Sequence, residues 1–230
     1  MKKSILNTPA FRYIFEIIVI VFSVTLSFYI QDVLNDRDKI ELKDIGLEAV
    51  LSDLKKDENF YKFGVKGIKR TSLYIDSITD NHSFISSKIF ERGVKRYFGF
   101  IGQDRNYNSM ISTGSIEFIE NKDLEETIHL YYTRNYDLMK DFAQQDEKYF
   151  NELEKYINSK YDVDILEFDK NGYYNFIYDE SVLKKMASDK TLRTLLLQKK
   201  WSNHVYIRQM NNSLERIARL KELIDSELNN

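Results

Sequence analysis

The chain has 230 residues, of which 30% are charged and 14% are aromatic, and its formal net charge is -2. This composition excludes a mainly disordered or collagen-like chain, and the near-neutral charge argues against nucleic acid as a partner. The sequence contains no cysteine, which excludes disulfides, thiol catalysis and cysteine-ligated zinc.

The N-terminal residues predict a membrane anchor. Residues 1–13 carry basic residues and no acid, and residues 17–30 are uncharged. A helix over residues 14–34 would be about 31 Å long, which matches one hydrocarbon thickness. Because basic residues next to an apolar run stay in the cytoplasm, we expect a cytoplasmic tail (1–13), a transmembrane helix (14–34) and a periplasmic helical domain (35–230).

Two other interpretations of the apolar run compete with an anchor in the cytoplasmic (inner) membrane. A cleaved signal peptide needs small residues at its cleavage site, and the run ends in FYIQDVLND without them. A buried core helix rarely runs this long without charge. The sequence therefore favours an uncleaved signal anchor, and the lipid bilayer is an expected partner of the chain.

Beyond the apolar run, the predicted elements are mostly helical. Apolar residues at helical spacing predict one unbroken helix as far as about Phe60. Gly64 and Gly67 permit a bend there, before a further helical piece over residues 68–78. Residues 80–83 predict a turn.

The middle of the chain predicts shorter elements. Residues 89–98 indicate an amphipathic helix and residues 99–106 a loop. Residues 107–112 predict a short helix that Gly114 ends in the left-handed conformation. Asn121 then caps a long helix. The apolar face predicted for this long helix consists of Leu124, Ile128, Tyr131, Leu138, Phe142, Tyr149, Leu153 and Ile157.

The C-terminal part combines a strand-like segment with a last helix. Residues 163–178 predict a small β-hairpin or an aromatic loop around the turn-forming pair Asn171-Gly172. From about Asp189 to Leu228, apolar residues at a spacing of three and four predict a helix. It could form a coiled coil between chains, but packing within the chain is commoner. The predicted fold class is all-α, an N-terminal transmembrane helix continuing into an extracytoplasmic helical bundle.

Two segments resemble a known family. The first, FEIIVIVFSVTLSFYIQDVLND (residues 15–36), places an acid at the inner end of the membrane run. The second, YNSMISTGSIEFIENKDLEETIHLYY (residues 107–132), contains S-T-G, then I-x-N-x-x-L, then Y-Y. Together they resemble a large bacterial family of single-pass membrane proteins catalogued only as a domain of unknown function. The family often has Gly where Ser23 stands here. The resemblance implies topology and fold and carries no activity.

No motif for catalysis or metal binding is found. The histidines His82, His129 and His204 form no metal-ligand pair, and nucleophile-elbow and phosphate-loop motifs are missing. A partial calcium-loop match over residues 167–172 fails, because Tyr178 stands where a bidentate Glu is needed. We therefore expect no enzyme activity, no cofactor and no metal.

A polar stripe marks the predicted membrane helix. Glu16, Ser23, Ser27 and Gln31 share one face at about 100° per residue. Because lipid offers no partner to a hydroxyl or an amide, the stripe predicts association with another membrane helix. Alternatively, the serine hydroxyls bond to the carbonyl four residues earlier, and Glu16 pairs with Arg12 near the membrane surface.

The sequence thus predicts a membrane-anchored, non-enzymatic component of the cell envelope that forms homo-oligomers or binds other envelope proteins. The alternative is a ligand-binding sensory module that signals through its long first helix. The aromatic residues of segment 161–178 could line its pocket, although such residues more often cap one end of a bundle. The short tail over residues 1–13 counts against autonomous signalling.

Overall fold

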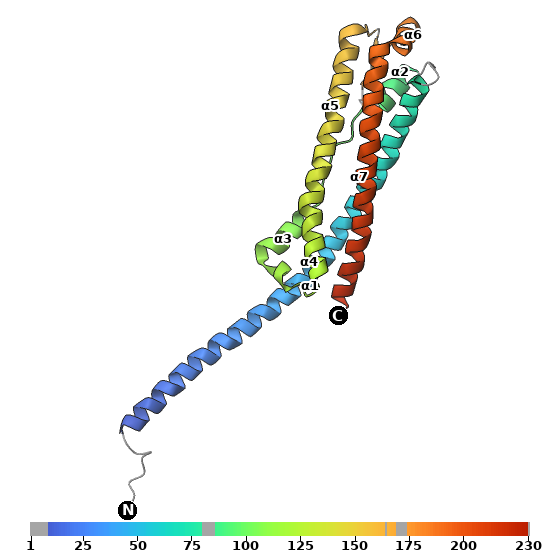
Figure 1. Cartoon of the computed structure of the whole chain (residues 1–230). Helices are drawn as coiled ribbons and strands as arrows, with labels where there is room; N and C mark the ends of the chain where they lie inside the picture. Colours follow the sequence, from blue (N-terminus) through green and yellow to red (C-terminus); the bar gives the residue numbers. More distant parts are fainter. Residues whose placement is uncertain (1–8, 80–85, 164, 169–173, 230) are drawn as a thin grey trace, which may run out of the picture.

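Three long helices form most of the protein: α1 (Pro9–Thr79), α5 (Tyr136–Lys160) and α7 (Lys190–Leu228). The computed structural model describes residues 9–79, 86–163, 165–168 and 174–229. Figure 1 shows α5 and α7 beside the C-terminal half of α1, while the N-terminal half of α1 extends away from them. The predicted all-α fold class is confirmed.

The helix α1 has two parts with different surroundings. Side chains described between residues 13 and 42 are almost all exposed, whereas from Lys43 onward one face is buried against the other helices. Most buried positions of α1 recur at alternating spacings of four and three: Lys43, Leu47, Val50, Leu54, Asp57, Tyr61, Gly64, Ile68, Thr71, Ile75 and Ile78. Asp53 and Thr79 are buried beside this series. A spacing that averages about 3.5 residues keeps one face of a helix against its neighbours. We call residues 13–42 the exposed segment and the packed remainder of the chain, from Lys43, the helical body.

The helix does not end at Gly64 or Gly67, where the sequence permitted a bend before a further helical piece, and α1 stays helical through both residues as far as Thr79. A Cβ atom at Gly64 would lie 2.7 Å from the ring of Phe98. The glycine therefore allows the close approach of this ring. The turn predicted at residues 80–83 lies outside the described residues.

After α1, the chain returns along the body. The short α2 (Ser87–Ile89) leads into a π-helical turn, η2 (Phe90–Val94), and residues 95–104 then run extended beside the helices. The helix predicted over residues 89–98 is therefore wrong beyond Val94. The N–H group of Phe98 donates a 2.9 Å hydrogen bond to a buried carboxylate of α5, so this segment is tied to a neighbour instead of continuing a helix.

Three short helical elements follow near the point where α1 leaves the body (Figure 1). They are α3 (Arg105–Thr113), the 3₁₀-helix η3 (Ser115–Phe118) and α4 (Lys122–Leu130). The predicted loop before α3 and the predicted break at Gly114 are both present.

The long helix predicted after Asn121 is present but contains a π-helical turn, η4 (Tyr131–Asn135), between α4 and α5. A π turn inserts an extra residue, and the buried face moves by one position. Met139 and Ala143 are therefore buried, while the predicted core residues Leu138 and Phe142 are only half-buried.

The predicted hairpin is confirmed. Strands β1 (Ile165–Phe168) and β2 (Tyr174–Ile177) pair antiparallel, with Phe168 opposite Tyr174. This register leaves residues 169–173 between the last paired residues, so it does not match a two-residue turn at Asn171-Gly172. The connecting residues themselves lie outside the described part of the chain.

The last helices close the body. The short α6 (Glu180–Ser188) lies at the end distant from the exposed segment, and α7 runs back antiparallel to α1 and α5 (Figure 1). Lys43 pairs with Glu227 at one end of the contact between α1 and α7, and Asn203 donates a hydrogen bond to Ser72 farther along it. The predicted packing of the last helix within its own chain is confirmed.

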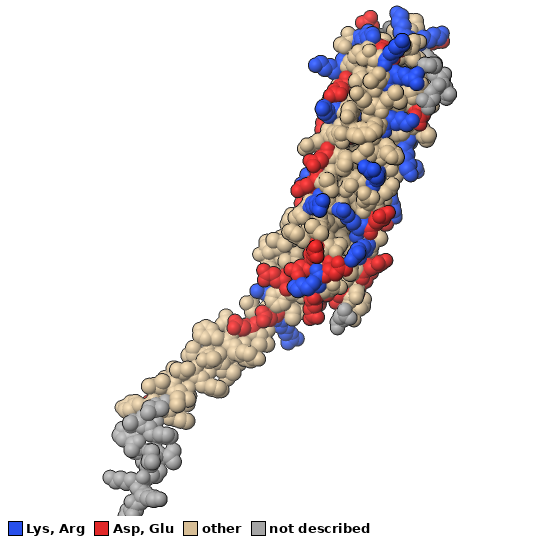
Figure 2. Space-filling view, in the orientation of Figure 1, with Lys and Arg blue, Asp and Glu red and all other residues tan. Residues whose placement is uncertain are grey.

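Charge is distributed unevenly along the protein (Figure 2). Acidic and basic side chains cover the helical body and the adjoining residues 32–42, whereas residues 17–31 of the exposed segment form an uncharged surface. Within the described residues, α1 holds the one stretch that is long and apolar enough to cross a membrane by length and composition, and none of that stretch is buried in the body.

Candidate functional site

The predicted association stripe lies on the exposed segment. Glu16, Ser23, Ser27 and Gln31 are all exposed. Ser23 Oγ donates a 2.7 Å hydrogen bond to the carbonyl of Val19, and Ser27 Oγ donates one of 2.8 Å to the carbonyl of Ser23. The serine hydroxyls therefore bond within the helix, as the alternative interpretation predicted, and helix association through this face stays a prediction.

Both residues of the predicted structural motif take the expected conformation. Gly114 follows α3 with a φ angle of 71°, in the left-handed region. The side chain of Asn121 accepts hydrogen bonds from the N–H groups of Asp123 (3.0 Å) and Leu124 (3.3 Å). The helix end at Gly114 and the N-cap at Asn121 are confirmed.

A buried carboxylate near the C-terminus holds this motif against α1. Glu227 accepts hydrogen bonds from the N–H groups of Glu120 (2.8 Å) and Asn121 (3.1 Å), and it pairs with Lys43 at 3.2 Å. Burial opposes ionisation of Glu227, but these hydrogen bonds outweigh it and lower its pKa. One carboxylate thus joins three segments at the point where α1 leaves the body.

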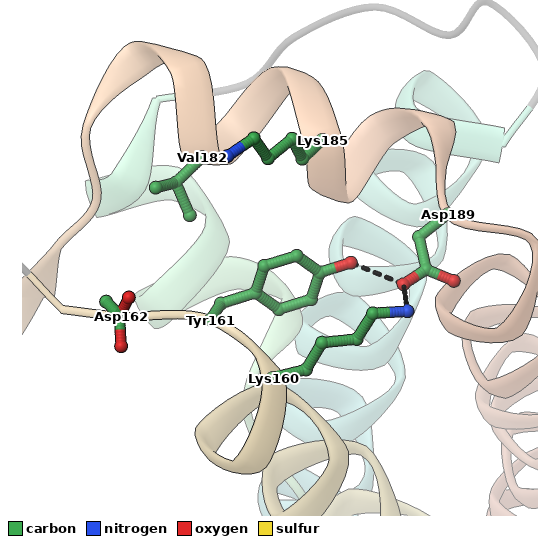
Figure 3. A pocket seen from close by; sticks show the side chains of 6 residues that line it. All are labelled: Lys160, Tyr161, Asp162, Val182, Lys185 and Asp189. Atoms are coloured by element: carbon green, nitrogen blue, oxygen red, sulfur yellow. Dashed lines mark hydrogen bonds and ion pairs between the residues drawn. The ribbon is translucent and has the colours of Figure 1, made fainter.

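An open hollow of about 430 Å³ lies at the opposite end of the body (Figure 3). Asp189 stands at its edge and caps α7 by accepting the N–H groups of Thr191 (2.8 Å) and Leu192 (3.1 Å). The same carboxylate accepts a hydrogen bond from the hydroxyl of Tyr161 and one of 2.7 Å from Lys160 (Figure 3). Asp189 therefore fastens the end of α5 to the start of α7.

The hollow offers no group poised for proton transfer at this edge. Burial opposes ionisation of Asp189, but the hydrogen bonds from Lys160 and Tyr161 hold its pKa well below its usual range. Burial and the adjacent carboxylate raise the pKa of the Tyr161 hydroxyl. A general acid or base works best with a pKa near the working pH, so these groups serve the helix junction.

The aromatic segment over residues 161–178 mainly caps the body. Tyr161 and Tyr178 are buried in a hydrophobic core with Leu153 and Leu196, although Tyr161 also borders the hollow. Phe168 is exposed. Capping of the helices is therefore the interpretation that the packing favours for the buried members of this segment.

A carboxylate surrounded by tyrosines is buried in the middle of α1. Asp57 Oδ2 accepts hydrogen bonds from the hydroxyls of Tyr131 (2.8 Å) and Tyr136 (2.5 Å), while Oδ1 has no hydrogen-bond partner among the described residues. Burial, together with the nearby charge of Asp53, raises the pKa of Asp57 to about 6 despite these two bonds. Because its neighbours belong to the hydrophobic core, this proton equilibrium acts on folding stability.

A buried ion pair joins α5 to α7. The side chains of Asp146 and Lys199 are each 1% exposed. Asp146 Oδ1 accepts a hydrogen bond from Lys199, and Oδ2 accepts the N–H group of Phe98. Burial lowers the pKa of Lys199, and Asp146 compensates only in part. A cavity of about 50 Å³ adjoins the pair and is also bordered by Gly67 of α1.

Sequence reasoning missed Asp57, Asp146 and Lys199. The sequence did contain a sign of them, because each of the three lies at helical spacing from apolar residues that are buried in the core. Asp57, for example, follows Leu54 and precedes Tyr61 on the buried face of α1. Charged residues are almost never fully buried unless they are paired, so an acid or base in the apolar phase marks a buried polar contact.

Comparisons with protein-family models, with curated proteins and with solved structures found no match. The resemblance of residues 15–36 and 107–132 to a family of single-pass membrane proteins therefore stays a prediction. What the chain does is inferred from its own geometry.

Proposed function

We propose that this chain is a membrane-anchored, non-enzymatic protein of the cell envelope, whose helical body is held outside the inner membrane by α1. The observation that carries the proposal is the exposed segment of α1. Its apolar side chains point in every direction, and large ones such as Phe22 and Phe28 are mostly exposed. A helix that is apolar all round needs apolar surroundings, and the helical body does not supply them.

The orientation of the anchor rests on charge. Basic residues lie on the N-terminal side of the apolar run, and basic flanks are retained in the cytoplasm. The body, which begins at Lys43, then lies on the other side of the bilayer. Because α1 is one continuous helix, the body is held at a fixed distance from the membrane helix and not by a flexible linker.

Protease accessibility tests this topology. In a strain that produces the chain with a C-terminal tag, added protease should remove the body from spheroplasts and spare it in intact cells. The tagged chain should also stay in the membrane pellet after alkaline carbonate extraction. Protection of the body in spheroplasts would contradict the orientation, and a mature N-terminus near Asp32 would contradict an uncleaved anchor.

The proposed role is interaction within the membrane. The stripe of Glu16, Ser23, Ser27 and Gln31 offers a polar face with small side chains, and such faces let two membrane helices approach closely. Pull-down of the tagged chain from detergent extracts should recover second copies or other envelope proteins. Ser23→Leu should weaken this recovery, whereas Val21→Leu, on the opposite face, should leave it unchanged.

A ligand-binding sensory role is the second candidate. The cavity beside Lys199 favours it, because Gly67 of α1 borders that cavity and α1 runs from there to the exposed segment without a break. A sensor predicts that cross-linking between membrane helices changes when a ligand is added. An interaction protein without a ligand predicts cross-linking that depends only on concentration.

A further inference from the structure

We propose that the cavity beside Asp146 and Lys199 is a binding site for a small oxyanion, either a carboxylate group or a phosphate. The cavity lies where α1, α5, α7 and the extended segment over residues 95–104 meet. This site does not depend on the membrane topology proposed above.

The floor of the cavity carries a buried cation with unused donors. An ammonium group has three N–H donors, and within the described residues Lys199 uses one of them, toward Asp146. Both carboxylate oxygens of Asp146 are already engaged, one by Lys199 and the other by the N–H group of Phe98. Buried donors are satisfied in most proteins, so further acceptor oxygens fit beside Lys199.

The rim of the cavity adds positive charge. Arg70 of α1 and Arg96 of the extended segment both line it, and neither has an ion-pair partner among the described residues. Arg96 also disfavours the charged form of Lys199. Three cations thus face one carboxylate, that of Asp146, and a bound anion would relieve the repulsion between them.

The size and lining of the cavity define the class of ligand. One water needs about 10–15 Å³ of such space, and the cavity of about 50 Å³ therefore suits a group of a few heavy atoms. Guanidinium groups match the planar geometry of carboxylates and the edges of phosphates. Thr71 and Asn203, which also line the cavity, supply neutral polar groups. A nucleotide or a sugar would be too large.

Binding is tested by thermal unfolding of the full chain in a non-ionic detergent, with phosphate, acetate and chloride at matched ionic strength. A saturable rise in Tm of about 3–6 °C is expected at ten times the Kd. Phosphate or acetate should produce it at millimolar concentration, and chloride should not. A response to phosphate alone identifies a phosphate site, and a response to acetate alone identifies a carboxylate site.

Substitution of Gly67 provides a matched pair of variants. A Cβ atom at Gly67 has nothing within 4 Å, so Gly67→Ala should fold and keep the anion response. Gly67→Leu extends a larger side chain into the open space and should abolish it. Loss of the response only in Gly67→Leu supports the site, and an unchanged response in Gly67→Leu overturns it.

Charge variants keep the test decisive if Gly67→Leu does not fold. Arg70→Gln and Arg96→Gln should each weaken binding of the responding anion about tenfold, because each removes a charged donor to the anion. Arg134→Gln removes an exposed arginine of η4 that does not line the cavity, and it should leave binding unchanged. The proposal is overturned if no anion gives a saturable response in the wild-type chain, or if all three arginine variants respond like it.

Discussion

The two parts of α1 share one continuous backbone but differ in how their apolar residues are arranged. In the exposed segment, apolar residues occur on every side, and Leu26 is 44% exposed. In the helical body, they recur at alternating spacings of four and three, and Leu54 is fully buried. The arrangement of apolar residues, more than their number, decides whether a stretch of helix packs against its own chain or needs other surroundings.

Polar side chains differ between the two parts in the same way. In the exposed segment, the hydroxyls of Ser23 and Ser27 return to carbonyls of their own helix. In the helical body, Asp57 accepts hydrogen bonds from the tyrosines of η4 and α5. The serine hydroxyls of the exposed segment are therefore satisfied within their own helix, whereas Asp57 in the helical body needs partners on neighbouring helices.

The largest expected effect comes from the same substitution made in both parts. Leu54→Ala removes a fully buried side chain and should lower the free energy of unfolding by about 2–5 kcal/mol. Leu26→Ala should change the stability of the body by less than about 0.5 kcal/mol. Chemical denaturation in detergent, followed by circular dichroism, measures both. Equal losses would mean that the exposed segment also packs against the body.

Asp57 makes the stability of the body depend on pH. Its pKa is raised in the folded chain from 3.8 to about 6. Folding therefore favours the protonated form, and stability that is fully present below pH 3.8 is lost as the pH rises through 6. The difference between the two pKa values corresponds to about 3 kcal/mol.

Asp57→Asn removes this dependence while keeping an oxygen that can accept the tyrosine hydroxyls. The stability of the variant relative to the wild type should rise by up to about 3 kcal/mol between pH 4 and pH 7. Asp36→Asn, in the exposed segment, should change stability at neither pH. Unfolding measured at both pH values checks the prediction, and a constant difference for Asp57→Asn would refute it.

The motif around Gly114 should have a smaller effect on stability. Gly114→Val should cost more than about 1 kcal/mol, because β-branched residues avoid the left-handed conformation seen there. Asn121→Ala should cost about 1 kcal/mol by removing a helix cap. Thermal unfolding measures both. Full stability combined with lost biological activity would show that the segment is a binding site instead of a structural element.

Local signals explain which parts of the fold were predictable. The helix end at Gly114, the cap at Asn121 and the strands around residues 163–178 depend on residue types with strong local preferences. The continuity of α1 through Gly64 could not be predicted from local preferences. It depends on the ring of Phe98, from a distant segment, which fills the space beside this glycine. Tertiary contacts of this kind leave no local trace in the sequence.

The candidate sites were less predictable than the fold. The shift of the buried face from Leu138 to Met139 follows from the π turn η4, which no simple periodicity announces. The cavity depends on Asp146 and Lys199, which are 53 residues apart. Each could have been recognised in the sequence as a charged residue on the apolar face of its helix. Their pairing, however, could not be predicted without the packing of α5 on α7.

The smallest energies belong to the predicted association stripe, because a polar contact between membrane helices is worth only about 0.6 kcal/mol. Disulfide scanning detects proximity without requiring a large energy, and the chain has no cysteine of its own. Single cysteines from residue 19 to residue 31 should cross-link most strongly at Ser23, Ser27 and Gln31.

The opposite face of the same helix supplies the control for this scan. Cross-linking should be weakest for cysteines placed at Val21, Thr25 and Tyr29. Thr25 is the sharpest of these controls, because its hydroxyl donates to the carbonyl of Val21 just as the serine hydroxyls donate to theirs. A difference between Ser23→Cys and Thr25→Cys would therefore report the face of the helix and not the loss of a local hydrogen bond. A flat profile, or a maximum at Val21, would contradict association of the predicted membrane helix through the face of Ser23 and Ser27.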